Sequence, residues 1–227
     1  MLPVLLLPGM MCDARLFAPQ LIALAEYDCS VMAITEYDTV ADLAAHILDH
    51  APPKFALAGL SMGGIVAMAI VAQASERVEK LCLMDTNPLA EIPEIQQRRE
   101  PQIAKVRAGQ LRQVMQQEMK PLYLADSERV DILDLCLDMA QSLGAEVFER
   151  QSRALQSRPD QCPALRDYSG KTLILHGRHD RLCPQDRHEL IQECIPHADY
   201  VIIEEAGHLP TLEQPEATAE AIRRWLV

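Results

Sequence analysis

The sequence predicts an α/β protein built on a mostly parallel sheet of about six strands, with helices on both faces. Three observations predict this class. Short, continuously apolar runs alternate with amphipathic segments up to residue 88 and again from residue 160. Runs that are apolar throughout are typical of parallel strands covered on both faces. Residues 90–158 show helical periodicity and no strand signal. We therefore expect a core of residues 1–88 and 160–227 and an inserted helical cap at 89–159.

The first part of the core holds four of the expected strands, at residues 3–7, 29–34, 54–58 and 80–85. A helix is expected from about residue 14 to 25, between the first two strands. Thr39 has the features of an N-cap, and the apolar positions that follow it repeat at helical spacing until Pro52 and Pro53 end the pattern. An Ala-rich helix follows the third strand and runs to about Ala74.

The remaining segments complete the alternation. Residues 171–176 and 200–203 are the last two expected strands, and residues 213–226 form the last helix. The cap is expected to contain about four helices. One of them carries apolar residues on one face and acidic residues on the other, with Ile132, Leu133, Cys136, Leu137 and Ala140 opposite Asp131, Asp134 and Asp138.

Bulk properties exclude several classes of protein. The chain of 227 residues is long enough for one full core, and its formal net charge of −12 argues against nucleic acid or an anionic membrane as a partner. No run approaches the roughly 18 apolar residues of a membrane span, and the start lacks the basic region of a signal peptide. The seven cysteines are irregularly spaced, which favours free thiols, a cytoplasmic location and no metal site.

Ser61 is the leading candidate for a nucleophile. It lies in the pattern Gly-Leu-Ser-Met-Gly, between an apolar strand and an Ala-rich helix. A sharp strand-to-helix turn holds such a serine out at the sheet edge in a strained conformation. Gly59 and Gly63 lie where a larger side chain would collide with the folded-back chain. Met62 presents its N–H at the start of the helix, where unpaired donors and the helix dipole favour an anion.

A nucleophilic serine needs a base and a carboxylate that orients the base. Asp180 follows the strand at 171–176, and His208 follows the strand at 200–203. The carboxyl ends of parallel strands share one edge of the sheet, so both side chains are expected beside Ser61. Asp85, after the preceding strand, is the alternative acid, although the Gly-x-x-Asp-x-x-x-Pro pattern favours Asp180. His179 adjoins the acid in sequence, so its side chain is expected to point elsewhere.

Four segments in this order resemble the serine hydrolases of the α/β-hydrolase fold: residues 7–10, 59–64, 176–184 and 207–215. The chain is similar to the small capped esterases that include pimeloyl-ester carboxylesterases and enol-ester lyases. The resemblance implies that Ser61 is the nucleophile, His208 the general base and later acid, and Asp180 its orienting partner. It also implies an oxyanion hole made by the N–H groups of Met10 and Met62, with no cofactor and no metal.

The sequence departs from this family in two places. Pro8-Gly9 stands where relatives commonly have His-Gly, which keeps the backbone donor but changes the loop. The chain also begins at what would be the third strand of its relatives, and a smaller sheet of about six strands is expected.

The expected function is therefore carboxylic-ester hydrolysis through an acyl-enzyme, with a small-molecule ester as the partner and the oligomeric state left open. Acyl transfer, lactone opening, C–C hydrolysis or a lyase step would use the same triad. A non-catalytic ligand receptor is a further alternative, against which the intact triad argues.

Two sets of residues have open roles in substrate binding. Met10, Met11 and Met62 either line an adaptable apolar acyl pocket or, for Met62, pack in the core. Three arginines near the end of the cap either form a solvated helix face or bind an acidic substrate: Arg150, Arg153 and Arg158.

Overall fold

The computed structural model describes all residues from 1 to 227, and its centre is a six-stranded sheet. The strands lie in the order β2-β1-β3-β4-β5-β6, and every neighbouring pair is parallel. They are β1 (Val4–Leu7), β2 (Cys29–Val31), β3 (Phe55–Leu60), β4 (Val78–Met84), β5 (Lys171–Gly177) and β6 (Asp199–Ile203). The predicted sheet of about six strands is confirmed.

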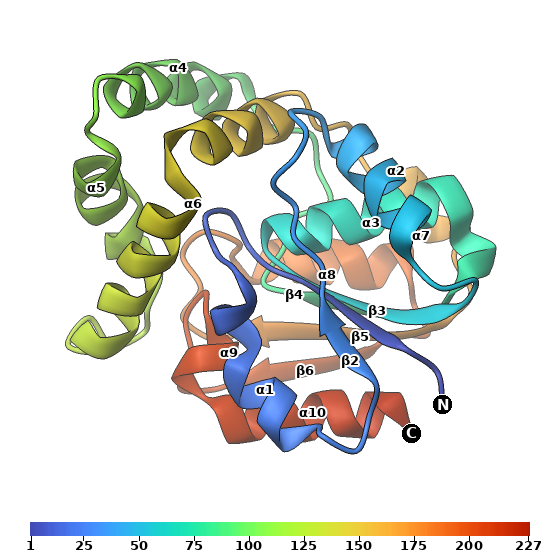
Figure 1. Cartoon of the computed structure of the whole chain (residues 1–227). Coiled ribbons are helices and arrows are strands. Elements are labelled where there is room, and N and C mark those ends of the chain that lie inside the picture. Colours follow the sequence, from blue (N-terminus) through green and yellow to red (C-terminus); the bar gives the residue numbers. More distant parts are fainter.

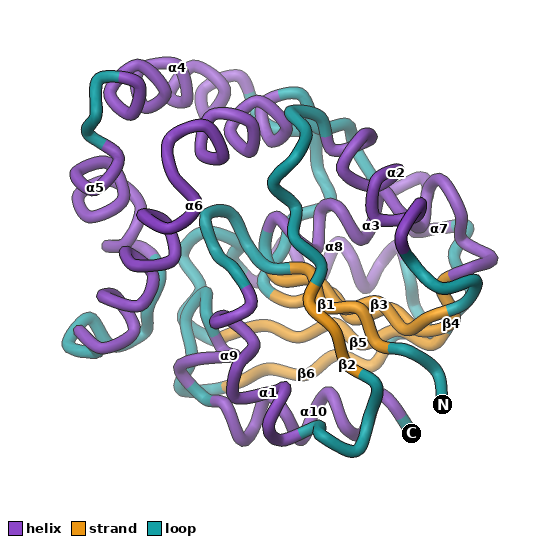
Figure 2. Tube along the Cα trace, in the orientation of Figure 1, coloured by secondary structure: helices purple, strands orange, loops and turns teal.

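Helices cover both faces of this sheet, as Figures 1 and 2 show. One face is covered by α2 (Val40–His50), α3 (Met62–Ala74), α7 (Cys162–Arg166) and α8 (Gln185–Cys194). The other is covered by α1 (Ala18–Ala23), α9 (Pro210–Glu213) and α10 (Pro215–Leu226). Alternate residues of a strand therefore enter different cores: Leu57 packs with α3, whereas Ala56 and Ala58 pack toward α10. Every residue of β3 is buried, as the continuous apolar run predicts.

The helical segment between β4 and β5 lies at the end of the molecule to which the strands' carboxyl ends point (Figure 1). It contains α4 (Pro93–Arg107), α5 (Leu111–Val114), a π-helical turn (Met115–Met119), a 3-10 turn (Lys120–Leu122) and α6 (Val130–Gln156). At Gly144, with φ 83° and ψ 178°, α6 leaves helical geometry and changes direction. Glycine adopts this backbone conformation without a Cβ clash, so α6 forms two arms rather than one straight rod.

Two of the predicted helices are interrupted, and prolines explain both breaks. The helix expected at 14–25 is a 3-10 turn (Ala14–Phe17), capped by the Asp13 side chain, followed by α1 with Pro19 in its first turn. The helix expected at 213–226 is split into α9 and α10 at Gln214, whose φ of −135° and ψ of 66° are not helical. Pro215 disfavours the helical region for the residue before it. The second strand also ends earlier than expected, at Val31.

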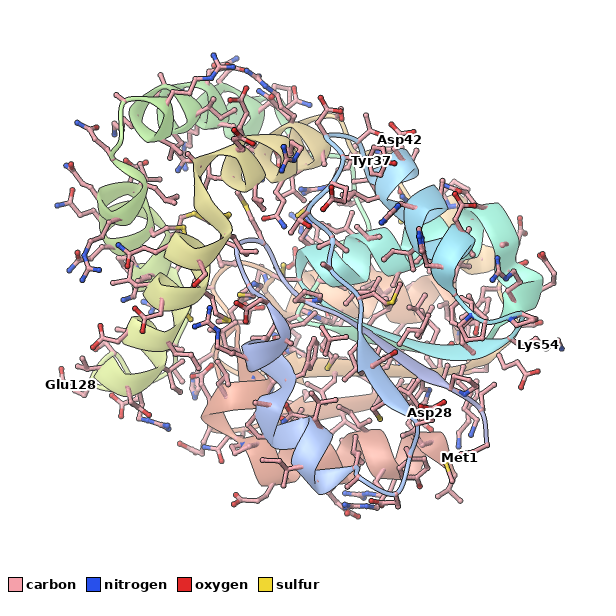
Figure 3. The ribbon with its side chains drawn as sticks, viewed as in Figure 1. Met1, Asp28, Tyr37, Asp42, Lys54 and Glu128 are labelled. Carbon is pink, nitrogen blue, oxygen red and sulfur yellow. The ribbon has the colours of Figure 1, made fainter.

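Charged side chains are spread over the outside of the molecule, with Lys54 and Glu128 near opposite ends (Figure 3).

A short 3-10 turn, Ser75–Arg77, connects α3 to β4. All seven cysteines are unpaired. None of the helices combines the length and the apolar character that crossing a bilayer requires.

Candidate active site

Ser61 lies in a strained turn between β3 and α3. Its φ of 57° and ψ of −118° are unusual for a residue with a side chain, and surrounding contacts must hold them. The Ser61 N–H donates to Met84 O at 2.8 Å, and the Thr86 hydroxyl donates to Ser61 O at 2.7 Å. A Cβ on Gly59 would overlap the Gly63 carbonyl. The turn therefore has the geometry that the sequence predicts.

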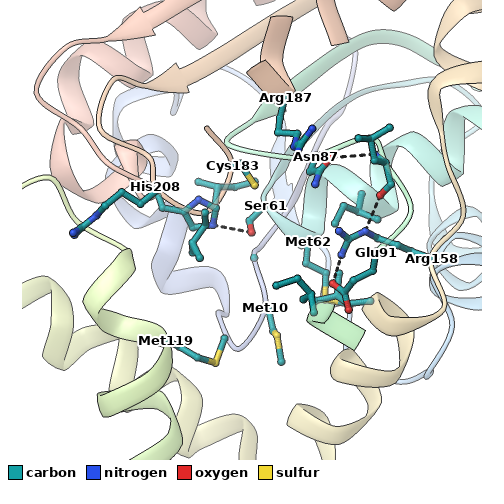
Figure 4. Close-up of a pocket in the computed structure, with 18 of the residues that line it drawn as sticks. Met10, Ser61, Met62, Asn87, Glu91, Met119, Arg158, Cys183, Arg187 and His208 are labelled. Atoms are coloured by element: carbon teal, nitrogen blue, oxygen red, sulfur yellow. Dashed lines mark hydrogen bonds and ion pairs between the residues drawn. The ribbon is translucent and has the colours of Figure 1, made fainter. Parts of the chain in front are cut away.

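The structure brings Asp180 and His208 to this serine from two neighbouring strand ends. His208 Nε2 lies 2.8 Å from Ser61 Oγ (Figure 4). On the other side of the ring, His208 Nδ1 lies 2.8 Å from Asp180 Oδ2. A carboxylate only accepts hydrogen bonds, so Nδ1 carries the proton and Nε2 is free to accept from the serine hydroxyl. His208 and Asp180 are both buried. This arrangement allows His208 to take the Ser61 proton.

Asp180 is held as a carboxylate by its neighbours. Its Oδ1 accepts hydrogen bonds from the N–H groups of Leu182 at 2.8 Å and Cys183 at 3.0 Å. Burial opposes ionisation, but the adjacent His208 and these two donors outweigh it, so the pKa of Asp180 is lowered. His179, next to it in sequence, does not line the cavity that contains Ser61 and lies at other surface pockets, as expected.

Asp85, the alternative acid, makes no hydrogen bond to His208, whose two ring nitrogens bond Asp180 and Ser61. It follows β4 with a φ of 43°, it is fully buried, and its Oδ1 accepts from Gly177 N–H at 2.9 Å. Its Oδ2 has no hydrogen-bond partner. Burial, together with the nearby Asp180 carboxylate, raises the pKa of Asp85 well above its usual range. The two aspartates thus have opposite preferences for a proton.

The expected oxyanion donors flank the serine. Met62 is the first residue of α3, so its N–H has no partner within the helix. Met10 follows Gly9, whose backbone lies against Ser61, and the Met10 N–H donates to no protein acceptor. Both methionines line the cavity that contains Ser61. An oxyanion formed at the serine would lie between these two donors.

The structure does not place Met11 at the substrate cavity, which corrects its expected role in substrate binding. Its side chain is fully buried in the core and is absent from the cavity lining. Its φ is 57°, and its N–H donates to the Gln151 side chain at 2.8 Å. Gln151, from the second arm of α6, also donates to Ile34 O at 3.0 Å. Met11 therefore shapes, through its backbone, the loop that carries Met10.

A buried carboxylate that the sequence did not predict, Glu213, holds the loop that carries His208. Glu213 is buried, and its Oε1 accepts from Gly207 N–H at 2.9 Å and Leu209 N–H at 3.1 Å. Its Oε2 accepts from Ala125 N–H at 2.7 Å. The His208 N–H itself donates to Tyr123 O at 2.6 Å. The histidine backbone is thus fixed on both sides.

A buried histidine pair lies next to Thr86, which bonds the Ser61 turn. His188 Nε2 accepts from Thr86 N–H at 3.2 Å, and its ring stacks on His176 with centroids 4.3 Å apart. Burial, with a further contribution from His176, lowers the pKa of His188 to about 3. The pair is therefore neutral at physiological pH, and Thr86, which also bonds Ser61, depends on that neutral form.

The cavity beside Ser61 has a volume of about 470 Å³, which suits a small organic molecule. Fifteen of its 25 lining residues are hydrophobic. The helical segment between β4 and β5 contributes Met119, Leu155 and Arg158 to its wall. The site is therefore a largely apolar chamber between the sheet edge and the helical segment that joins β4 to β5, with Ser61 and His208 on one side (Figure 4).

The three arginines with open roles separate in the structure. Arg158 lines the cavity with a side chain only 10% exposed, and it pairs with Glu91 at 2.7 Å. Arg153 pairs with Glu100, and Arg150 donates to Thr35 O at 2.7 Å. The expected solvated face therefore does not include Arg158. Glu91 and its partner Arg99 were not singled out from the sequence, since no local pattern marks them.

One group of side chains has the proximity of a metal site, and it overlaps the triad. Ligand atoms of Asp180, Cys183 and His208 lie within 4.8 Å of one another. Burial raises the pKa of the Cys183 thiol well above its usual range, which disfavours the thiolate that a metal would need. His208 Nδ1 and Asp180 already bond each other, so this group fits a proton relay better than a metal.

Fold and site together define a class of protein, and comparison with known proteins agrees. Residues 4–221 match the model of the alpha/beta hydrolase family, and the chain belongs to this family. It is similar to the pimeloyl-[acyl-carrier protein] methyl ester esterase of Nitrosomonas europaea, with 25% identity over 215 residues, covering 85% of this chain and 77% of the relative. The esterase of the same name from Pectobacterium carotovorum is 25% identical over 205 residues, which cover 81% of this chain and 74% of that relative.

Solved structures extend the likeness over the whole chain. A thermophilic esterase from Thermogutta terrifontis, solved with malate bound, superposes with a TM-score of 0.90 at 30% identity, covering 100% of this chain and 89% of that one. The enol-lactonase from Burkholderia xenovorans LB400 superposes with a TM-score of 0.87 at 20% identity, covering 100% and 92%, which shows a shared fold. These relatives support a hydrolase of the esterase type.

Proposed function

We propose that this protein is a serine hydrolase that cleaves a small carboxylic ester through an acyl-enzyme on Ser61. The observation that carries the proposal is the unbroken path from Ser61 Oγ through His208 to Asp180, with both contacts at 2.8 Å, at the wall of an apolar cavity. Nucleophile, base and orienting acid in this geometry are the elements of acyl transfer to serine.

Acylation begins when His208 Nε2 accepts the Ser61 proton as Oγ attacks the ester carbonyl. Negative charge then develops on the carbonyl oxygen, between the N–H groups of Met10 and Met62. Each such donor contributes about 10²–10³-fold to the rate in comparable enzymes. The ionised Asp180 stabilises the imidazolium that forms. His208 next gives its proton to the leaving alcohol, which departs and leaves the acyl group on Ser61.

Deacylation repeats these steps with water in place of serine. His208 removes a proton from water, the hydroxide attacks the acyl carbonyl, and the same two N–H groups hold the second oxyanion. The Ser61 oxygen then leaves with the proton from His208. The balance needs ester and water and produces an acid and an alcohol, without an organic cofactor. The cap supplies part of the cavity wall, and we propose that it selects the acyl group.

The same triad supports neighbouring reactions, and the relatives illustrate their range. One set of relatives is named for a methyl ester of a pimeloyl-acyl carrier protein and one structural neighbour for an enol-lactone. Acyl transfer, lactone opening, C–C hydrolysis and lyase chemistry stay as alternatives to simple ester hydrolysis.

Because the cysteines are unpaired, we also propose a reducing location such as the cytoplasm.

The test is hydrolysis of p-nitrophenyl butyrate by the wild type and by Ser61→Ala. We expect a burst of p-nitrophenol equal to the enzyme concentration, followed by slower turnover, and no burst from the variant. A fluorophosphonate probe should label the wild type at Ser61. Equal rates in both proteins would refute the acyl-enzyme, and the absence of labelling would favour a ligand receptor.

A further inference from the structure

The cavity beside Ser61 has a charge opposite to that of the whole chain. The protein has a formal net charge of −12, yet four arginines line this cavity and only one carboxylate does, that of Glu91. Arginines on an otherwise acidic protein attract anions where field lines are focused into a cleft. An apolar neutral ester would gain nothing from this arrangement.

Arg158 is the arginine that the cavity encloses most. Its side chain is 10% exposed, its Nε donates to Leu89 O at 3.0 Å, and its Nη1 donates to Glu91 Oε1 at 2.7 Å. Its Nη2 donates to no protein acceptor, and this atom is not sealed from the cavity. A buried guanidinium therefore retains free N–H donors at the wall of the chamber.

Glu91 does not balance the charge around it. Arg99 also donates to Glu91, through Nε and through Nη2 at 2.6 Å, and its side chain is 12% exposed. One carboxylate thus serves two buried guanidinium groups. Burial and the like charge of Arg99 lower the pKa of Arg158 in spite of Glu91. A second anion at this place would complete the charge balance of the cluster.

The position of the cluster indicates which part of an ester it would meet. Figure 4 shows Arg158, Glu91, Asn87 and Arg187 on the opposite side of Ser61 from His208. His208 must protonate the leaving oxygen, so the alcohol lies on the His208 side. The acyl group then extends past Met10 and Met62 toward the arginines.

We propose that Arg158 and Arg99 form an anion subsite that binds a carboxylate at the far end of the acyl group. The substrates are then half esters of short dicarboxylic acids, which carry one ester and one free carboxylate. A planar guanidinium with free N–H groups fits a carboxylate better than an ammonium does. This inference rests on the proposed function, because the subsite is defined by its position relative to Ser61.

The test compares two p-nitrophenyl esters of equal chain length: p-nitrophenyl valerate, which is neutral, and mono-p-nitrophenyl glutarate, which ends in a carboxylate. We expect wild-type kcat/KM to favour the glutarate ester by roughly 10–100-fold at low salt, the range of a charge-assisted contact. Arg158→Gln should remove this preference, mainly by raising KM for the glutarate ester. Arg224→Gln, on an exposed arginine of α10, is the control for a general charge effect.

Two further measurements keep the test decisive if Arg158→Gln folds poorly. Arg158→Lys keeps the charge and removes the planar fork, so it should retain part of the preference. With the wild type alone, free glutarate should inhibit the hydrolysis of p-nitrophenyl valerate at least tenfold more strongly than free butyrate does.

Equal use of the two esters with equal inhibition by the two acids would overturn the subsite. A preference for a carboxylate on the leaving group, tested with 4-carboxyphenyl valerate against phenyl valerate, would overturn its assignment to the acyl side. If the wild type cleaves no ester, the proposed function fails. Calorimetric binding of glutarate to wild type and Arg158→Gln then still decides whether the anion subsite exists.

Discussion

Replacing Glu213 should separate the positioning of His208 from substrate binding. Glu213 accepts three backbone N–H groups, from Gly207, Leu209 and Ala125. Hydrogen bonds to a charged group contribute about 1.5–3 kcal/mol each. In Glu213→Gln the remaining oxygen retains two of these bonds, but the new NH₂ group faces the Ala125 N–H. We therefore expect a loss of about 2–3 kcal/mol in the free energy of unfolding.

Glu213→Ala leaves all three donors without a partner, so its loss should be larger, about 4 kcal/mol or more. The catalytic effect follows from the histidine loop. A displacement of about 1 Å in a catalytic group costs up to about 10²-fold, so we expect kcat of Glu213→Gln to fall by about tenfold or more. KM should change little, because Glu213 does not line the cavity beside Ser61.

The assay combines urea denaturation with steady-state hydrolysis of p-nitrophenyl butyrate. Glu193→Gln is the matched control, since Glu193 is exposed and makes no hydrogen bond through its side chain. It should behave as the wild type in both measurements. The reasoning would be refuted if Glu213→Gln unfolded at the wild-type urea concentration with an unchanged kcat.

Three other predictions follow from the buried groups around the triad. Because the pKa of Asp85 is raised, the native state binds more protons than the unfolded state above about pH 4, and the free energy of unfolding falls as pH rises. Asp85→Asn should make this fall with pH less steep. This variant should keep most activity, whereas Asp180→Asn should lose about 10³–10⁴-fold in kcat; the reverse order would make Asp85 the catalytic acid. His188, with a pKa of about 3, should destabilise the protein by up to about 1.4 kcal/mol per pH unit as pH falls from 6.5, and His188→Gln should reduce that slope in urea midpoints. A Cβ on Gly63 would overlap the Leu7 carbonyl, so Gly63→Ala should lower Tm strongly. Gly109→Ala is the control, because the space there is open and only the positive φ is strained, so its Tm should fall far less. Similar Tm values for the two variants would contradict the clash.

The parts of the site that sequence could predict are those that follow strands. Ser61 comes directly after an apolar strand, Asp180 and His208 lie in the short loops that follow two others, and the carboxyl ends of parallel strands meet at one edge. Their mutual proximity therefore follows from topology. The glycines at 59 and 63 mark a turn whose tightness the structure displays directly, through the overlap that a Cβ would cause.

The parts that escaped prediction depend on contacts between distant segments. Glu91 meets Arg158 across 67 positions, and Gln151 meets Met11 across 140 positions, with no local pattern in either case. Helical periodicity predicts the helices of residues 89–159 but does not encode which way an arginine points. Met11 illustrates the same limit: its side chain lies in the core because its backbone turns through a positive φ.

The contacts of the 89–159 segment have a consequence for protein engineering. Gln151 bonds the loop that carries Met10, and Tyr123 O accepts the N–H of His208. Ala125 shares Glu213 with the same histidine loop. A chimera that receives this segment from another esterase would therefore exchange the contacts that hold the loops of Met10 and His208, together with part of the cavity wall. Grafts that keep a glutamine at 151 and the backbone path of 123–125 should retain turnover while changing the acyl groups that they accept.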